Sequence, residues 1–169
     1  QGPVGLNATL FGAATCANVI AIDPIAERRE LALKLGASHA IDPMAVDPVE
    51  AINEITHGKG AEASLDASGV GAVRRTAVLS TRVWGRACFV GEGGGVNFED
   101  ATNDIIHRQV TLLGSWTFST VVLEELGHYI IDRNIPLKSL LLHRYSLDNV
   151  EEAFMLFGAG NAGKSTSIW

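Results

Sequence analysis

The stretch GAGNAGKS at residues 158–165 matches the pattern G-x-x-x-x-G-K-[ST] at every fixed position. That pattern is typical of a loop whose backbone N–H groups, with the dipole of the helix that follows, hold nucleotide phosphates. The flanking sequence predicts the opposite order, because EEAFMLF before the match is helical and STSIW after it is strand-like. We therefore predict a helix before the match, a strand after it, and no NTPase site here.

A second glycine pattern lies in GPVG at residues 2–5. In the dinucleotide fingerprint G-x-G-x-x-G, the second glycine lets backbone approach a pyrophosphate and the third lets the helix pack closely on a strand. Gly2 and Gly5 fit these two places, and the first glycine and its strand would precede Gln1. Asp23 follows Gly5 by 18 residues, near the spacing of about 20 at which an acid binds the adenosine ribose hydroxyls.

The charges around Asp23 bear on the choice of cofactor. A carboxylate at this place repels the 2′-phosphate of NADP, so Asp23 favours NAD over NADP. The same carboxylate can cap the helix predicted from Pro24, and the two roles are compatible. Arg28 and Arg29 leave NADP open, because an arginine in this region can pair with a 2′-phosphate.

Helical and strand-like patterns alternate along most of the chain. Helices are predicted over residues 3–16, 24–37, 46–57, 71–81, 104–108, 120–133 and 147–157, and strands over residues 18–23, 39–42, 62–68, 85–91, 109–116 and 165–169. The alternation predicts an α/β fold with a doubly wound parallel sheet, whose ligands bind at the carboxyl ends of the strands. The sheet would lack its central first strand, and each unpaired ladder group would cost about 1–3 kcal/mol. We hypothesise that the sequence is part of a longer protein.

Composition excludes several classes of protein. A length of 169 residues with 47% hydrophobic residues fits one globular domain, and the net charge of −6 argues against a nucleic-acid partner. No apolar run reaches about 18 residues, so we expect no membrane span. Cys16 and Cys88 match no metal spacing and are interpreted as small buried thiols of an intracellular protein.

Seven blocks, which span nearly the whole chain, occur in the order typical of one enzyme family. They are GPVGLNA (2–8), VIAIDPIAERRELALKLGA (19–37), DASG (66–69), WGRACFVGEGG (84–94), LLGSW (112–116), HRYSLDNVEEAF (143–154) and AGKSTSIW (162–169). With these blocks the sequence resembles the nucleotide-binding portion of the medium-chain zinc-dependent alcohol and polyol dehydrogenases. The block WGRACFVGEGG is most similar to the branch that contains sorbitol and threonine dehydrogenases. The resemblance implies a Rossmann-like doubly wound sheet.

The resemblance also implies an NAD site, with a role for each matching residue. These are Gly2, Pro3, Val4 and Gly5 at the pyrophosphate; Asp23 and Arg28 at the adenosine; Ala67, Ser68 and Gly69 at the ribose; and Val90, Gly91, Glu92, Ser115 and Trp116 at the nicotinamide. For Ser115 and Trp116 the alternative is a packed strand end. Sheet edges near that segment often pair with a second subunit in this family, which implies a homodimer or homotetramer.

One departure from the family limits what the chain can do. The zinc ligands, structural-zinc cysteines and proton-relay residues of the family belong to a lobe that precedes this portion, so zinc is expected only there. The histidines show no ligand spacing, and we expect no catalytic and no metal-binding residue in this chain. They are His39, His57, His107, His128 and His143.

The sequence therefore predicts that residues 1–169 form the NAD(P)-binding domain of a cytoplasmic oxidoreductase. Residues from about 140 to 169 would return toward the absent catalytic lobe. The whole enzyme would pass hydride from the carbon of a small alcohol or polyol to NAD, with zinc as the Lewis acid, and the chain alone would be inactive. The alternative is a non-catalytic, nucleotide-binding regulatory module. A preceding lobe that bears Cys, His and Glu would favour the enzyme.

Overall fold

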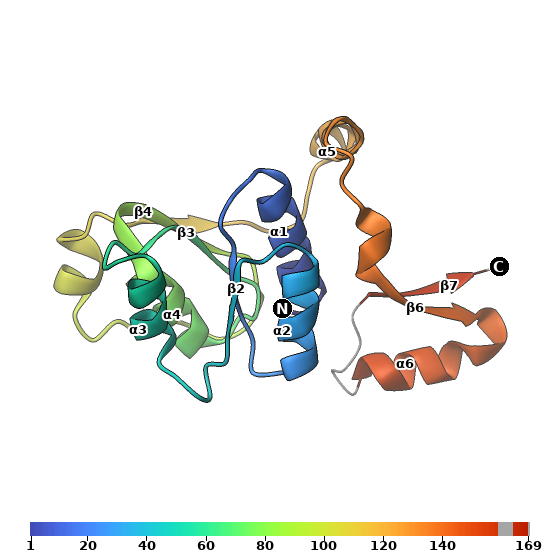
Figure 1. Cartoon of the computed structure of the whole chain (residues 1–169), viewed down its shortest axis with the longest axis horizontal. Coiled ribbons are helices and arrows are strands. Elements are labelled where there is room, and N and C mark those ends of the chain that lie inside the picture. Colours follow the sequence, from blue (N-terminus) through green and yellow to red (C-terminus); the bar gives the residue numbers. More distant parts are fainter. Residues whose placement is uncertain (159–163, 169) are drawn as a thin grey trace.

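Helices and strands alternate along the chain in the computed structural model, which describes residues 1–158 and 164–168 (Figure 1). The α-helices are α1 (Pro3–Ala14), α2 (Ala26–Lys34), α3 (Pro48–Ile55), α4 (Gly71–Ser80), α5 (Thr120–Asp132) and α6 (Val150–Gly158). The strands are β1 (Ile20–Ile22), β2 (His39–Ile41), β3 (Ala61–Asp66), β4 (Thr81–Phe89), β5 (Thr111–Gly114), β6 (Leu141–Ser146) and β7 (Lys164–Ile168). Shorter helical turns are η1 (Thr102–Ile106), η2 (Leu137–Leu140) and η3 (Leu147–Asn149). The predicted α/β alternation is confirmed.

Each strand pair is parallel, and the strands of the described residues form three sheets: β1-β2, β3-β4-β5 and β6-β7. A doubly wound sheet has the strand order 3-2-1-4-5-6. In that order β2 and β1 correspond to the third and second strands, and β3, β4 and β5 correspond to the fourth, fifth and sixth strands. Among the described residues no strand corresponds to the central first strand, so β1 and β3 each have one strand partner. The fold is Rossmann-like, and its sheet divides at the place that the sequence predicts.

The main hydrophobic core lies between the amino-terminal helices and β1. Leu6 and Leu10 of α1 are buried with Ala21 of β1 and Ala32 of α2. Tyr129 of α5 packs on the same cluster, and its ring stacks on Phe11 of α1 with centroids 6.2 Å apart. A smaller core contains Val78 of α4, Ala87 of β4 and Val110, which precedes β5. Packing in these two cores holds β1 and β4 in place, and with them the loops that follow these strands.

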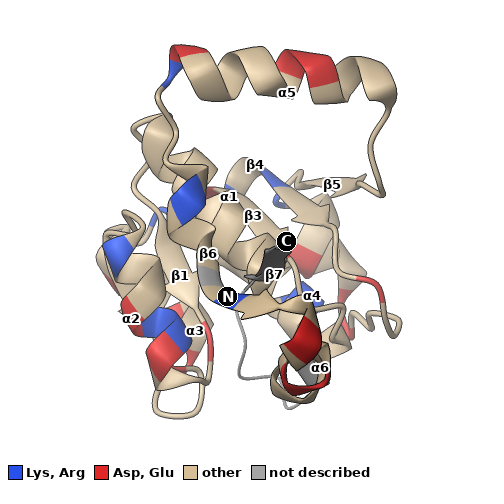
Figure 2. Cartoon of the chain, turned by 90° about the vertical axis from the view of Figure 1, so that its right-hand side faces the viewer, with Lys and Arg blue, Asp and Glu red and all other residues tan. Residues whose placement is uncertain are grey.

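The carboxyl-terminal elements form a unit of their own. In β6 and β7 two parallel strands pair, with α6 as the connection between them. Figure 2 shows this unit on the side facing the viewer, while α5 lies across one end of the molecule. Because α6 ends at Gly158 and β7 begins at Lys164, the order is helix and then strand, as predicted for the GAGNAGKS stretch. Residues 159–163 of that stretch lie outside the described residues.

None of the helices described here is both long and apolar enough to cross a lipid bilayer.

The prediction of two buried thiols is wrong, because Cys16 is exposed and Cys88 is half-buried. Cys16 lies in the turn after α1 with a φ of 62°, and this turn carries it away from the core.

Candidate functional site

The amino terminus of α1 and the carboxyl end of β1 lie side by side. Gly2 is the N-cap residue of α1 and Pro3 is its first residue. The first amides of a helix have no intrahelical acceptor, and Pro3 has no N–H, so Val4 and Gly5 offer the free donors. Asp23 follows β1, and its Oδ2 accepts a hydrogen bond from the backbone nitrogen of Gln1, next to the start of α1. The predicted pyrophosphate and ribose residues therefore share one edge of the molecule.

Asp23 is held by its own turn as well. Its Oδ1 accepts a hydrogen bond of 2.8 Å from the amide of Ile25, next to the start of α2. Its Oδ2 lies 3.7 Å from Nη1 of Arg28, the other residue predicted at the adenosine. Only 5% of Asp23 is exposed. Asp23 thus shapes the turn that precedes α2. The alternative that it caps this helix is wrong, because the N-cap residue of α2 is Ile25 and no side-chain hydrogen bond caps the helix there.

Arg29 has a different partner. Its Nη2 lies 3.0 Å from Oδ2 of Asp42, after β2, while its Nη1 donates a hydrogen bond of 2.8 Å to the carbonyl of Asp23. The guanidinium thus ties the ends of β1 and β2 together. Its charge is compensated by a carboxylate of the protein.

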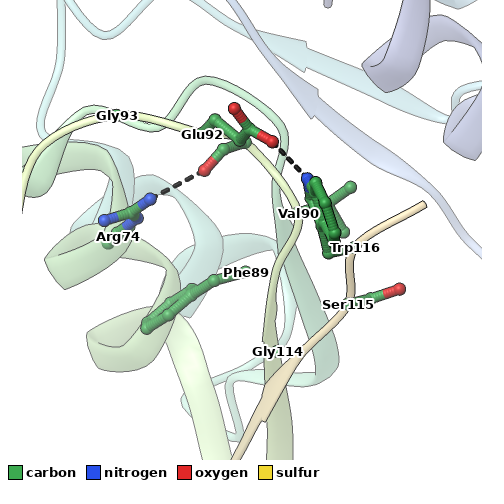
Figure 3. A pocket seen from close by; sticks show the side chains of 9 residues that line it. Arg74, Phe89, Val90, Glu92, Gly93, Gly114, Ser115 and Trp116 are labelled. Atoms are coloured by element: carbon green, nitrogen blue, oxygen red, sulfur yellow. Dashed lines mark hydrogen bonds between the residues drawn. The ribbon is translucent and has the colours of Figure 1, made fainter.

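A second cluster surrounds a surface pocket of about 560 Å³ at the carboxyl ends of β4 and β5 (Figure 3). Five residues predicted at the nicotinamide line it: Val90, Gly91, Glu92, Ser115 and Trp116. The indole nitrogen of Trp116 donates to Oε1 of Glu92, and the amide of Ser115 donates to the carbonyl of Phe89 at 3.1 Å. Trp116 is 75% exposed, so the alternative of a packed strand end is wrong for this residue.

The loop at residues 67–69, after β3, adjoins this pocket through backbone contacts. Gly69 has a φ of +74°, and a Cβ placed there would lie 1.9 Å from the carbonyl oxygen of Glu92. At Gly91 a Cβ would lie 2.2 Å from the amide nitrogen of Gly69. Ala67, Ser68 and Gly69 are thus brought next to the residues predicted at the nicotinamide, and glycine is required where the two loops touch.

The pocket also contains residues that sequence reasoning missed. They are Arg74, Phe89, Gly93 and Gly114. Arg74 lies in the first turns of α4, eight residues after Asp66 at the end of β3. An acid that ends a strand and a base on the next helix form a signal that could have indicated this pair.

Comparison with known sequences decides the family. The sequence profile of the zinc-binding dehydrogenases matches residues 3–130.

The chain belongs to the zinc-binding dehydrogenase family.

Relatives of this family match over almost the whole chain. An uncharacterized zinc-type alcohol dehydrogenase-like protein of Escherichia coli K12, YphC, is 35% identical over 96% of the chain and 46% of its own length. L-threonine 3-dehydrogenase of Bacillus licheniformis is 29% identical over 99% of the chain and 49% of its own length. The chain thus spans about half the length of these curated relatives.

Solved structures of dehydrogenases have the same fold. The alcohol dehydrogenase of the archaeon Aeropyrum pernix superimposes with a TM-score of 0.83 at 27% identity, over 99% of this chain and 48% of its own. The 2R,3R-butanediol dehydrogenase of Bacillus subtilis gives a TM-score of 0.82 at 26% identity, over 96% of this chain and 46% of its own.

The described part of this zinc-binding dehydrogenase chain does not fit a zinc ion. Among its described residues, no group of three or more His, Cys, Asp or Glu side chains lies close enough to hold a metal. A zinc site needs three or four such ligands. We therefore assign no step of the chemistry to zinc on these residues.

Proposed function

We propose that this chain is the NAD-binding domain of a zinc-dependent dehydrogenase that transfers hydride from an alcohol carbon to NAD. One observation carries the proposal: the loops after β3, β4 and β5 meet around one pocket. The contact between the start of α1 and the end of β1 adds support. In doubly wound folds, dinucleotides bind at the carboxyl ends of the strands in this way.

The residues at the start of α1 suit the pyrophosphate. The free amides of Val4 and Gly5 and the positive end of the helix dipole favour an anion. Gly2 leaves open space, since a Cβ placed there would meet no atom within 4 Å. These features allow a phosphate group to approach the backbone closely.

The charges at the end of β1 support NAD rather than NADP. Asp23 is an acceptor for the ribose hydroxyls and repels a 2′-phosphate. Arg29, which could attract such a phosphate, is paired with Asp42 at 3.0 Å. Arg28, near Asp23, would border the adenine.

The pocket residues would position the nicotinamide. When bound, NAD supplies the hydride acceptor of the reaction. The amides of Val90, Gly91 and Ser115 already donate within the protein, so the backbone carbonyls of Val90 and Ser115 would accept hydrogen bonds from the carboxamide. The rings of Phe89 and Trp116, which line the pocket, would exclude water from one side of the reacting ring.

Further parts of the proposal concern the whole enzyme. We propose that residues from about 140 to 169 return toward the other half of the protein, which would supply zinc and bind a small alcohol, polyol or amino alcohol. L-threonine 3-dehydrogenase and 2R,3R-butanediol dehydrogenase among the similar proteins support this substrate class. We also propose a cytoplasmic homodimer or homotetramer joined through the exposed edge strand β5, which light scattering of the purified protein tests.

A thermal-shift titration tests the proposed function on the chain itself. A ligand at 100 times its Kd stabilises the folded state by about 2.7 kcal/mol, so NADH should raise the melting temperature. NADPH should raise it less at equal concentration, and Mg-ATP should not raise it. The chain alone should not produce NADH from alcohols. Stabilisation by Mg-ATP without stabilisation by NADH would contradict the proposal.

A further inference from the structure

Arg74 of α4 contacts three separate groups around the pocket at the carboxyl ends of β4 and β5. Its Nε lies 3.3 Å from Oδ2 of Asp66, at the end of β3. Its Nη2 donates a hydrogen bond of 2.7 Å to the carbonyl of Gly91, and its Nη1 donates to the carbonyl of Gly94. The guanidinium also lies 5.7 Å from the ring centroid of Phe89. One largely buried side chain, 14% exposed, thus connects the ends of β3 and β4 with the loop that follows β4.

Asp66 is the other half of this connection. It is fully buried, with 0% exposed. Its Oδ1 accepts hydrogen bonds from the amide of Ser68 at 2.8 Å and from the hydroxyl of Ser68 at 2.7 Å. The amide of Gly69 donates to both carboxylate oxygens, at 3.3 and 3.2 Å. A buried charge requires such partners, and here the partners are the loop at residues 67–69 and Arg74.

The backbone of Asp66 continues the link to the next strand. Its carbonyl accepts hydrogen bonds from the amides of Val90 at 2.9 Å and Gly91 at 3.0 Å. Further along the chain, the loop that follows β3 and the loop that follows β4 are in close backbone contact. A Cβ at Gly71 would lie 2.3 Å from the carbonyl oxygen of Gly95, and one at Gly93 would lie 2.5 Å from that of Gly69. A shift of either loop therefore moves the other.

We propose that Asp66 and Arg74 form a positioning pair that sets the two loops around the nicotinamide end of the dinucleotide. The inference rests on the proposed NAD site and adds to it two residues that the site prediction did not contain. The pair acts through the loops at residues 67–69 and 91–94, both of which it holds. Among the described residues the pair forms no hydrogen bond or ion pair with the start of α1 or with Asp23, so the adenosine half of the ligand should be independent of it.

Arg74→Met removes the guanidinium and keeps a long apolar stem. Binding of NADH and of ADP-ribose, which lacks the nicotinamide, is measured by calorimetry on the purified chain. We expect NADH to bind about tenfold more weakly or worse, and ADP-ribose to change less than about twofold. Arg74→Lys keeps the positive charge but loses the planar guanidinium that contacts Asp66, Gly91 and Gly94 together. It should weaken NADH binding by an intermediate factor. It also tests the inference if Arg74→Met does not fold.

Arg75→Met is the matched control, because it makes the same change at the next position of α4. Arg75 lies 4.0 Å from Asp104 and is 41% exposed, and it contacts neither loop among the described residues. Both ligands should bind this variant as they bind the original chain. In ¹H–¹⁵N spectra, amide shifts of Gly91 and Gly93 should move in Arg74→Met and stay in Arg75→Met.

Three outcomes would overturn the inference, and they differ from one another. Unchanged NADH binding by Arg74→Met, with NADH still bound by the original chain, rejects the positioning pair alone. Equal weakening of NADH and ADP-ribose indicates a general structural role or a direct phosphate contact of Arg74, and also rejects it. Failure of the original chain to bind either ligand rejects the proposed NAD site itself, and the positioning pair with it.

Discussion

At the scale of single residues, Asp23 serves both the fold and the proposed ligand. Its Oδ1 accepts from the amide of Ile25 and so shapes the turn into α2. Its charge faces Arg28, whose Nη1 lies 3.7 Å from Oδ2 of Asp23. The shape of the turn needs an acceptor atom, whereas rejection of a 2′-phosphate needs the charge. These two demands can be separated by one substitution.

Asp23→Asn keeps an oxygen acceptor for Ile25 and removes the charge. We expect the Kd of NADPH divided by the Kd of NADH to fall by about tenfold, because repulsion of the 2′-phosphate is lost. Calorimetric titrations with both cofactors measure this ratio. Asp47→Asn is the control, since Asp47 caps α3 through Val49 and Glu50. An unchanged ratio in Asp23→Asn, or an equal change in the control, would speak against the role of the charge.

The sequence proposed many of the residues that gather at the candidate site, but not Arg74. Gly2, Gly5 and Asp23 follow from a spacing pattern, and Val90, Ser115 and Trp116 from the resemblance. The role of Arg74 depends on Gly91 and Gly94, which are 17 and 20 residues away in the sequence. Such contacts are set by how α4 packs beside β4, and no periodicity within one segment contains that information.

At the scale of elements, Arg108 holds the carboxyl-terminal end of α4. The last carbonyls of a helix have no intrahelical donors, and a cation there also meets the negative end of the dipole. The guanidinium of Arg108 donates to four carbonyls: Val78 at 3.3 Å, Leu79 at 3.0 Å, Asp104 at 3.3 Å, and Thr81. Because Arg108 follows η1, it fixes the segment that leads into β5.

Arg108→Ala should lower the free energy of unfolding by about 2 kcal/mol, because partly buried carbonyls lose a charged donor. Urea unfolding followed by tryptophan fluorescence measures this change, and an unchanged slope would show that the denatured state is the same. Arg86→Ala is the control on β4, where the side chain is exposed, and should stay within about 0.5 kcal/mol. Equal losses in the two variants would contradict a capping role.

The order of elements was predictable, whereas the buried face of α1 was not. Helical spacing of Val4, Ala8, Phe11 and Ala14 predicts an apolar stripe. In the structure Phe11 and Ala14 of this stripe pack against the core, but Val4 is 50% exposed. The buried residues of α1 are Gly5, Leu6, Thr9 and Leu10. α1 is apolar on several sides, so its partners α2 and α5 decide which side is buried. Strand β6 also escaped prediction, since its partner residues in β7 lie 22 or 23 positions further along the chain.

At the scale of the whole molecule, the arrangement of strands explains where rigidity should lie. β4 pairs with β3 on one side and β5 on the other. β1 pairs with β2 through three residues and has no other strand partner among the described residues. The two halves of the proposed NAD site therefore rest on sheets of unequal size. The nicotinamide side has the three-stranded sheet, and the adenosine side has the two-stranded one.

This inequality predicts a difference in local stability. In native-state hydrogen exchange of the intact chain, the slowest amides of β4 should be protected on the order of tenfold more strongly, or better, than the slowest amides of β1. Opening β4 breaks two ladders, whereas opening β1 breaks one short ladder. Amides of β3, which is an edge strand of the same sheet as β4, are the internal control and should be intermediate. Equal protection of β1 and β4 would mean that the two sheets open together as one cooperative unit, and would contradict this account.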